Sequence, residues 1–109
     1  MKTKEILTEE RASGRIPAKI EAHFIFNGIS YTGSASNISE TGIFIKACSI
    51  LPPASLFILI LETDIGLLKV MAGVKWIIKQ GRYGGMGVEL INTPKNYLAL
   101  VNKMGYEII

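Results

Sequence analysis

The 109-residue chain has few of the residues from which metal and nucleophile sites are built. It contains one cysteine, Cys48, and one histidine, His23, so it can form neither an internal disulfide nor a zinc site of Cys and His ligands. A Ser-His-Asp or Cys-His arrangement would depend on His23, whose segment alternates like a strand with an exposed or half-buried histidine. We therefore expect no catalytic residues and no metal site, and we predict that the chain is not an enzyme.

Long apolar runs and phosphate-binding loops are also missing. The longest apolar candidate, residues 47–61, is interrupted by Pro52 and Pro53 and is shorter than the about 20 residues that cross a membrane. The first residues, Met-Lys-Thr-Lys-Glu, do not form the apolar region of a signal peptide. The Gly-rich stretch at 84–87 lacks the Gly-Lys-Ser/Thr that completes a P-loop. We expect a cytoplasmic protein without membrane insertion.

Charge and composition indicate one globular domain. The chain is 49% hydrophobic and 19% charged, a balance typical of a globular chain and not of a disordered one. Its length of 109 residues corresponds to a single domain with a modest core. The net charge of +3 suits a small anionic ligand better than an extended nucleic-acid surface, so we expect no DNA partner.

From residue 16 onward the apolar pattern is mostly that of β-strands. Strands are predicted over residues 19–26, 30–38, 43–47, 56–61, 67–79 and 82–91. Asn27-Gly28 predicts a two-residue hairpin turn. The uniformly apolar segment 56–61 predicts a strand buried on both faces. Trp76 could offer a surface for base stacking, but it falls on the same strand face as the apolar residues before it and is therefore predicted to lie in the core. Gly73 is a candidate for a bulge or a barrel corner.

The last segment changes to a helical period. Thr93 and Pro94 are predicted as N-cap and first helical residue, and Gly105 as the C-terminal cap. The apolar residues at helical spacing are Tyr97, Leu98, Val101 and Met104. Six short strands and one helix predict an all-β fold, a six-stranded antiparallel β-barrel with a C-terminal α-helix packed on it. Residues 16–109 form this domain, and residues 1–15 form a flexible N-terminal arm.

Two polar stretches are candidates for ligand binding. Arg11 and Arg15 carry guanidinium groups, each of which can bind phosphate oxygens through two parallel hydrogen bonds and can stack on a flat ring. The alternative is a solvated arm in which the two charges have no function. In Asn37-Ile-Ser-Glu-Thr-Gly42, an extended backbone places the Asn37 amide and the Ser39 hydroxyl on one face, and Gly42 lets a flat ligand approach. The alternative is an ordinary turn, in which these residue types are common.

Together the two stretches resemble the motifs of the PilZ domain, RxxxR and [D/N]xSxxG, in the same order and at the same separation. The segments Arg15-Ile-Pro-Ala-Lys-Ile, Val74-Lys-Trp76 and residues 83–90 are also similar to this family, so the resemblance covers nearly the whole chain. PilZ domains are bacterial receptor modules for the second messenger cyclic di-GMP. The resemblance implies that this nucleotide is the ligand and that the fold is the PilZ barrel.

The resemblance also implies roles for the motif residues. Arg11 and Arg15 grip the phosphates and the Hoogsteen edge of guanine, and the second motif lines the guanine site. There, Asn37 addresses the guanine edge, Ser39 donates a hydrogen bond and Gly42 leaves room. An aspartate at position 37 would accept with a full charge, so Asn37 predicts weaker guanine binding, and Glu10 beside Arg11 opposes the phosphates.

Three functions follow from these observations. The first is a receptor whose flexible arm wraps onto the barrel when cyclic di-GMP binds and presents a new surface to an unidentified protein partner in motility, exopolysaccharide or pilus control. The second is a PilZ-like interaction module that does not bind the dinucleotide. The third is a small barrel that binds single-stranded RNA or DNA, which needs exposed aromatic residues along a basic groove.

Overall fold

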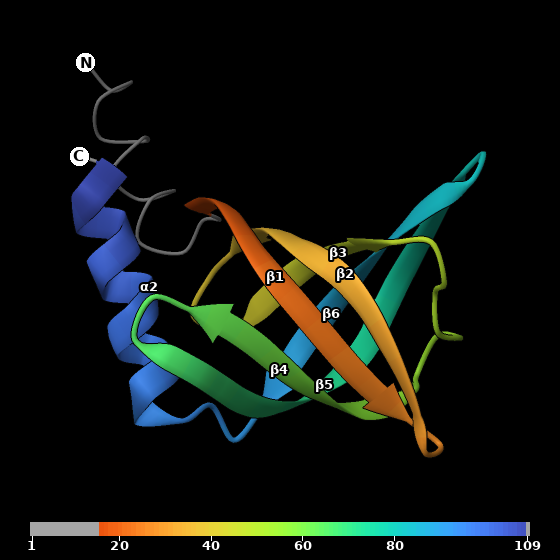
Figure 1. Ribbon diagram of the computed structural model, residues 1–109, viewed down its shortest axis with the longest axis horizontal. Helices are drawn as coiled ribbons and strands as arrows, with labels where there is room; N and C mark the ends of the chain where they lie inside the picture. Colours follow the sequence, from red (N-terminus) through yellow and green to blue (C-terminus); the bar gives the residue numbers. More distant parts are fainter. Residues whose placement is uncertain (1–15, 109) are drawn as a thin grey trace.

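Six strands close into a barrel, and one helix packs beside it (Figure 1). The computed structural model describes residues 16–108, and their side chains as far as residue 105. The elements are β1 (Ile16–Phe26), β2 (Ile29–Ile38), β3 (Gly42–Ala47), β4 (Leu56–Thr63), β5 (Gly66–Gln80), β6 (Tyr83–Ile91) and α2 (Lys95–Ile108). All paired strands are antiparallel, in the order β1-β2-β3-β6-β5-β4. The predicted barrel and helix are confirmed, whereas the arm assigned to residues 1–15 lies outside the described residues.

Local sequence signals account for the β1–β2 hairpin. Asn27 and Gly28 have φ angles of 52° and 77°, as a type I′ turn requires, and Phe26 pairs directly with Ile29. The tight turn sets the register of β1 against β2, and Ala22 and Phe24 of β1 face inward and are fully buried. The predicted two-residue hairpin is confirmed.

The barrel interior is filled by alternate residues of each strand. In β4, Phe57, Leu59 and Leu61 are buried, whereas Ile58 and Ile60 between them are only half-buried. The prediction of burial on both faces is therefore wrong for β4. A closed barrel has one interior, and the outward residues of this strand lie on the molecular surface.

A β-bulge in β5 changes which residues face outward. Val74 pairs with Val88 and Trp76 with Gly87, so β5 has one extra residue, Lys75, at this point. The extra residue reverses the inward–outward alternation. Trp76 is consequently 43% exposed on the outer face, and the prediction that it belongs to the core is wrong. Gly73, the candidate bulge, instead pairs regularly with Glu89.

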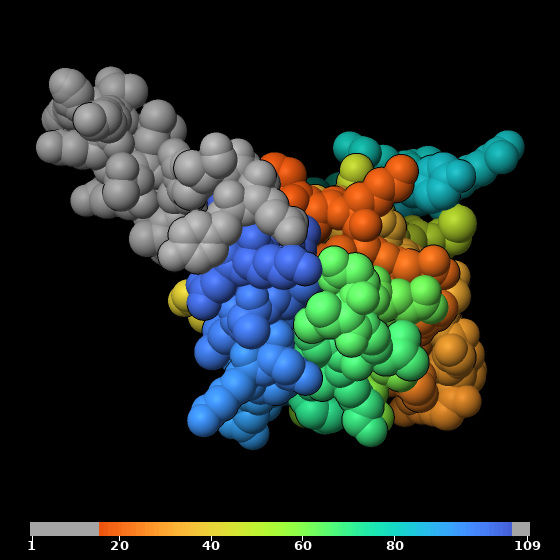
Figure 2. Space-filling model, turned by 60° about the vertical axis from the view of Figure 1, so that its left-hand side comes forward, coloured from red at the N-terminus to blue at the C-terminus, as the bar shows by residue number. Residues whose placement is uncertain are grey.

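Helix α2 buries one face against the barrel. Tyr97, Leu100 and Val101 are buried on this face, and Figure 2 shows the helix beside the β4–β5 hairpin. The Pro94 carbonyl accepts hydrogen bonds from the backbone N–H groups of Tyr97 and Leu98, so Pro94 occupies the N-cap position, one residue later than predicted. Among the described residues, no helix is long and apolar enough to span a membrane.

The helix continues through Gly105, which was predicted to end it. A Cβ atom at Gly105 would lie 3.5 Å from Ile16 Cδ1, an ordinary van der Waals distance. Packing of this face against the start of β1 offsets the cost of a glycine inside a helix, about 1 kcal/mol relative to alanine. Gly105 is therefore a helix-interior residue.

We predict that Gly105→Ala stabilises the protein by about 0.5–1 kcal/mol, because the helix gains propensity and the new methyl group fits. The measurement is urea denaturation followed by circular dichroism. Ala99→Gly, at an exposed position of the same helix, is the matched control and should destabilise by a similar amount. Destabilisation by Gly105→Ala would contradict the assignment of Gly105 as a helix-interior residue with room for a methyl group.

Candidate functional site

Ser39 builds the turn between β2 and β3. Its backbone N–H donates to the Gly42 carbonyl at 2.8 Å, and its Oγ accepts from the backbone N–H of Gly42 at 3.1 Å. In an ordinary two-residue hairpin, the backbone carbonyl of the first residue accepts the hydrogen bond from this N–H. Here the Ser39 hydroxyl oxygen accepts it instead. Ser39 is 8% exposed, and β2 ends at Ile38, so Asn37 and Ser39 do not share a strand face as the sequence predicted. The alternative interpretation of this stretch, an ordinary turn, describes the geometry from Ser39 to Gly42.

The Ser39 carbonyl accepts a hydrogen bond from a distant element. The Tyr97 hydroxyl of α2 donates to it at 2.6 Å, and Tyr97 is fully buried. The Thr41 carbonyl accepts from the Leu90 N–H of β6 at 2.9 Å. These bonds hold the turn against both the helix and the barrel, so its shape is determined by the whole fold.

Gly42 is required by the packing of the barrel itself. A Cβ atom there would lie 2.9 Å from the Val88 carbonyl oxygen of β6, closer than side chains tolerate. The neighbouring strand therefore partly fills the space at Gly42 that was expected to admit a ligand.

Asn37 is the residue of this motif whose side chain lies on the outer face of the barrel. Ala35 pairs with Ile45 and Asn37 with Phe44, so Ser36 is an extra residue in β2. Because Ala35 and Ile38 both point inward and are fully buried, Asn37 points outward and is half-buried. On β1 its pairing partner is Pro17.

An aromatic pair, Phe44 and Trp76, lies in the same cross-strand row as Asn37. The two rings stack with centroids 5.4 Å apart and planes 24° apart. Gly87 pairs with both residues, and a Cβ atom at Gly87 would overlap the Trp76 ring, as one at Gly85 would overlap the Phe44 ring. Outward glycines thus let both rings lie flat on the sheet. The alternation of Gly85 and Gly87 with inward-facing residues in β6 is the sequence signal that could have revealed this surface.

A shallow pocket continues from the aromatic pair along β3, β5 and β6. It has a volume of about 310 Å³ and is lined by Phe44, Lys46, Ile78 and Tyr83, with glycines of β6 among the other lining residues. Lys46 supplies a positive charge at this otherwise mainly apolar surface. The pocket can therefore accept a flat or anionic group beside the aromatic pair.

Arg11 and Arg15 lie outside the described residues. The structure does describe where the segment that follows them joins the barrel: Ile16 pairs with Ile38, and Pro17 pairs with Asn37. The chain thus begins β1 beside the second motif. Ile16 and Pro17, which follow Arg15 directly in the sequence, are thus neighbours of the second motif, although more than 20 residues separate Arg15 from Asn37 in the chain.

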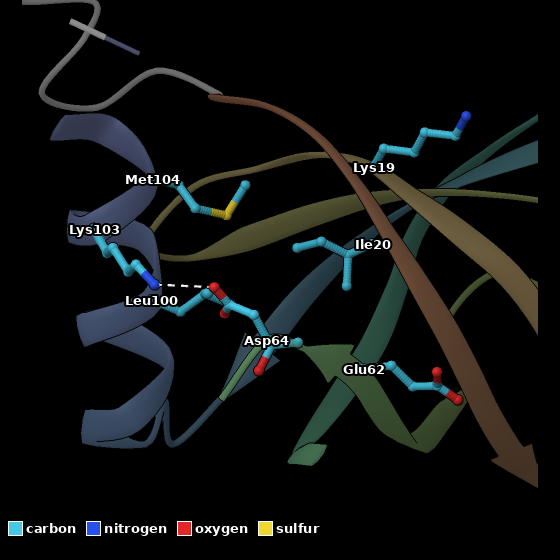
Figure 3. Close-up of a pocket in the computed structure, with 8 residues that line it drawn as sticks. Lys19, Ile20, Glu62, Asp64, Leu100, Lys103 and Met104 are labelled. Carbon is cyan, nitrogen blue, oxygen red and sulfur yellow. Dashed lines mark hydrogen bonds and ion pairs between the residues drawn. The ribbon is translucent and has the colours of Figure 1, made fainter. Parts of the chain in front are cut away.

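A second pocket, of about 210 Å³, lies between α2 and the ends of β1 and β4 (Figure 3). Lys103 of the helix donates to Asp64 Oδ2 at 3.0 Å across its rim. This hydrogen bond, and then the Lys103 charge, lower the pKa of the Asp64 carboxyl below its usual value. Both side chains are exposed, so the pair contributes little to stability.

The sequence matches the family model of the PilZ domain over residues 9–104, and the chain therefore belongs to the PilZ domain family. No curated protein sequence matches the chain.

Solved structures share the fold at low sequence identity. The inhibitor of motility MotI/DgrA of Bacillus subtilis has a TM-score of 0.70 at 17% identity, covering 83% of this chain and 47% of MotI. YcgR from Escherichia coli in complex with c-di-GMP has a TM-score of 0.73 at 11% identity, covering 88% of this chain and 44% of YcgR. The PilZ domain of YcgR with c-di-GMP has a TM-score of 0.70 at 10% identity, covering 87% of this chain and 88% of that domain. The chain thus spans about half the length of full MotI and YcgR.

We predict that Tyr97→Phe destabilises the protein by about 1–3 kcal/mol, because the Ser39 carbonyl loses its buried donor. Chemical denaturation gives the free energy of unfolding. Tyr83→Phe, at a 65% exposed tyrosine, is the control and should change stability by less than about 0.5 kcal/mol. Equal effects of the two variants would contradict a structural role for the Tyr97 hydroxyl.

Proposed function

We propose that the chain is a receptor domain for cyclic di-GMP. The observation that carries the proposal is the pairing of Ile16 and Pro17 with Ile38 and Asn37, because it places the residues that directly follow the RxxxR segment beside the second PilZ motif. Membership of the PilZ family supports it, as does the likeness to the E. coli YcgR domain, whose structure contains c-di-GMP.

Arg11 and Arg15 would bind the phosphates and the O6 and N7 acceptors of guanine, which match the two donors of a guanidinium group. Consecutive Cα atoms are about 3.8 Å apart, so the Cα of Arg15 lies within that distance of Ile16, the residue that pairs with Ile38. This covalent bond supports the proposal that the Arg15 side chain reaches a ligand bound at the second motif.

Asn37 would form hydrogen bonds with the edge of guanine from the outer surface of the barrel. Paired residues on neighbouring strands have Cβ atoms about 5 Å apart, so the Phe44 side chain is adjacent to Asn37. The aromatic pair then offers a flat face to a base that Asn37 holds, and stacking on an aromatic side chain contributes about 1–3 kcal/mol per base. Ser39 and Gly42 would act on the ligand mainly by shaping the turn beside Asn37, since the Ser39 hydroxyl already accepts from Gly42 N–H and donates to the Gly42 carbonyl at 3.3 Å.

The test is a titration of cyclic di-GMP into the full chain, followed by calorimetry and by the fluorescence of Trp76, the only tryptophan. We predict saturable binding that changes the fluorescence and weakens at least about tenfold, 1.4 kcal/mol, in Arg15→Ala because charge-assisted hydrogen bonds are lost. Arg82→Ala, at an exposed arginine on the β5–β6 turn, is the matched control and should bind normally.

A folded protein that gives no saturable heat at high concentration would overturn the receptor proposal and favour the interaction module. GMP in excess serves as a competitor, to separate dinucleotide recognition from weak nucleotide binding. We further propose that the bound arm presents a surface to a protein partner. Amide exchange over residues 8–15 that is unchanged by the ligand would contradict this relay.

Replacing Asn37 by aspartate gives a second prediction. Asn37→Asp should tighten cyclic di-GMP binding about three- to tenfold, because a carboxylate accepts from guanine N–H groups more strongly than an amide oxygen does. The dissociation constant is measured by calorimetry. Asn102→Asp, at an exposed position of α2, controls for the added negative charge and should leave binding unchanged. An Asn37→Asp affinity no higher than that of the unmodified chain would count against a contact between position 37 and guanine.

A further inference from the structure

Three side chains with metal-binding groups gather on the outer face of β1 and β4, where the proposed function uses none of them. Glu21 and His23 are two residues apart on β1 and point to the same side. Glu62 of β4 pairs directly with Glu21, and Figure 3 shows its carboxylate directed towards β1. One ligand atom from each of the three residues lies within 4.8 Å of the other two.

The distances are close to those around a bound ion. His23 Nε2 is 2.7 Å from Glu62 Oε2 and 3.9 Å from Glu21 Oε2. Ligand atoms that bind one zinc ion at about 2.1 Å lie about 3.0–3.4 Å from one another. Glu21 and Glu62 are 61% and 47% exposed, so their side chains can make the small rotations needed without disturbing the core.

The charges also favour a cation at this position. Carboxylates directly opposite one another on neighbouring strands repel, and this arrangement destabilises a sheet. With neutral imidazole, Glu21, His23 and Glu62 carry a total charge of −2, which one divalent ion balances. The ion would replace the proton that joins His23 Nε2 to Glu62 in the metal-free protein.

We propose that Glu21, His23 and Glu62 form a binding site for a divalent transition-metal ion. Two carboxylate oxygens and one imidazole nitrogen are a ligand set of the kind that zinc accepts, with water completing the coordination. The nitrogen ligand disfavours calcium and magnesium, which prefer oxygen alone. The bound ion joins strands whose ligands are 41 positions apart (62 minus 21) and thereby stabilises the fold.

This site is compatible with the scarcity of histidine and cysteine in the chain. One histidine and one cysteine cannot form a zinc site by themselves, but Glu62 of β4 comes close to Glu21 and His23 when β4 pairs with β1. The proposal is independent of nucleotide binding, because none of its ligands belongs to the motifs.

The experiment is a calorimetric titration of Zn²⁺ into the untagged full chain, with Mg²⁺ as the oxygen-preferring comparison. We expect one equivalent of zinc to bind saturably, to raise the thermal midpoint and to shift the NMR signals of the His23 ring. His23→Gln and Glu62→Gln should each weaken zinc binding at least tenfold, with circular dichroism confirming that they fold.

Two matched variants control for other ligands. Glu89→Gln removes a strand carboxylate that is 59% exposed, and Cys48→Ser removes the free thiol. Both should bind zinc like the unmodified chain. Absence of saturable zinc binding would overturn the proposal, as would zinc binding that survives His23→Gln or disappears in Cys48→Ser.

Discussion

The hydrogen bond from the Tyr97 hydroxyl to the Ser39 carbonyl connects the three parts of this molecule: barrel, helix and motif turn. In this turn Ser39 Oγ accepts from Gly42 N–H, and the Ser39 carbonyl accepts from the helix. A buried carbonyl without a donor is costly, so this bond constrains where α2 packs and how β2 passes into β3. The position of Asn37, two residues before Ser39, depends on the same constraint.

Two β-bulges decide which side chains reach the proposed ligand surface. The extra Ser36 in β2 turns Asn37 outward, and the extra Lys75 in β5 does the same for Trp76. Bulges often lie beside functional sites because they redirect a side chain while the barrel stays closed. Here they bring an amide and a stacked aromatic pair into one row across β2, β3, β6 and β5, with the glycines of β6 making space for the rings.

The residues of the second PilZ motif differ in their structural positions: Ser39 and Gly42 form the turn, and Asn37 lies on the outer face of β2. Ser39 and Gly42 are explained by the turn and by the approach of β3 to β6, whether or not a ligand binds. The Asn37 side chain lies on the outer face of the barrel and is half-buried. The presence of this serine and glycine therefore reflects the structure of the turn, and in the proposed receptor the nucleotide contacts are assigned to Asn37 and the two arginines.

The sequence by itself determined the six strands, the Asn27-Gly28 hairpin, the helix and the family, because apolar period, turn residues and motif spacing are local properties. Only the tertiary structure decided the exposure of Trp76, the continuation of α2 through Gly105 and the meeting of Glu62 with His23. Each of these depends on a partner distant in sequence: the register of β6 against β5, the start of β1 beneath the helix, and the pairing of β4 with β1. A local pattern specifies the period of an element, but the position of its bulges, ends and neighbours is set by packing across the barrel.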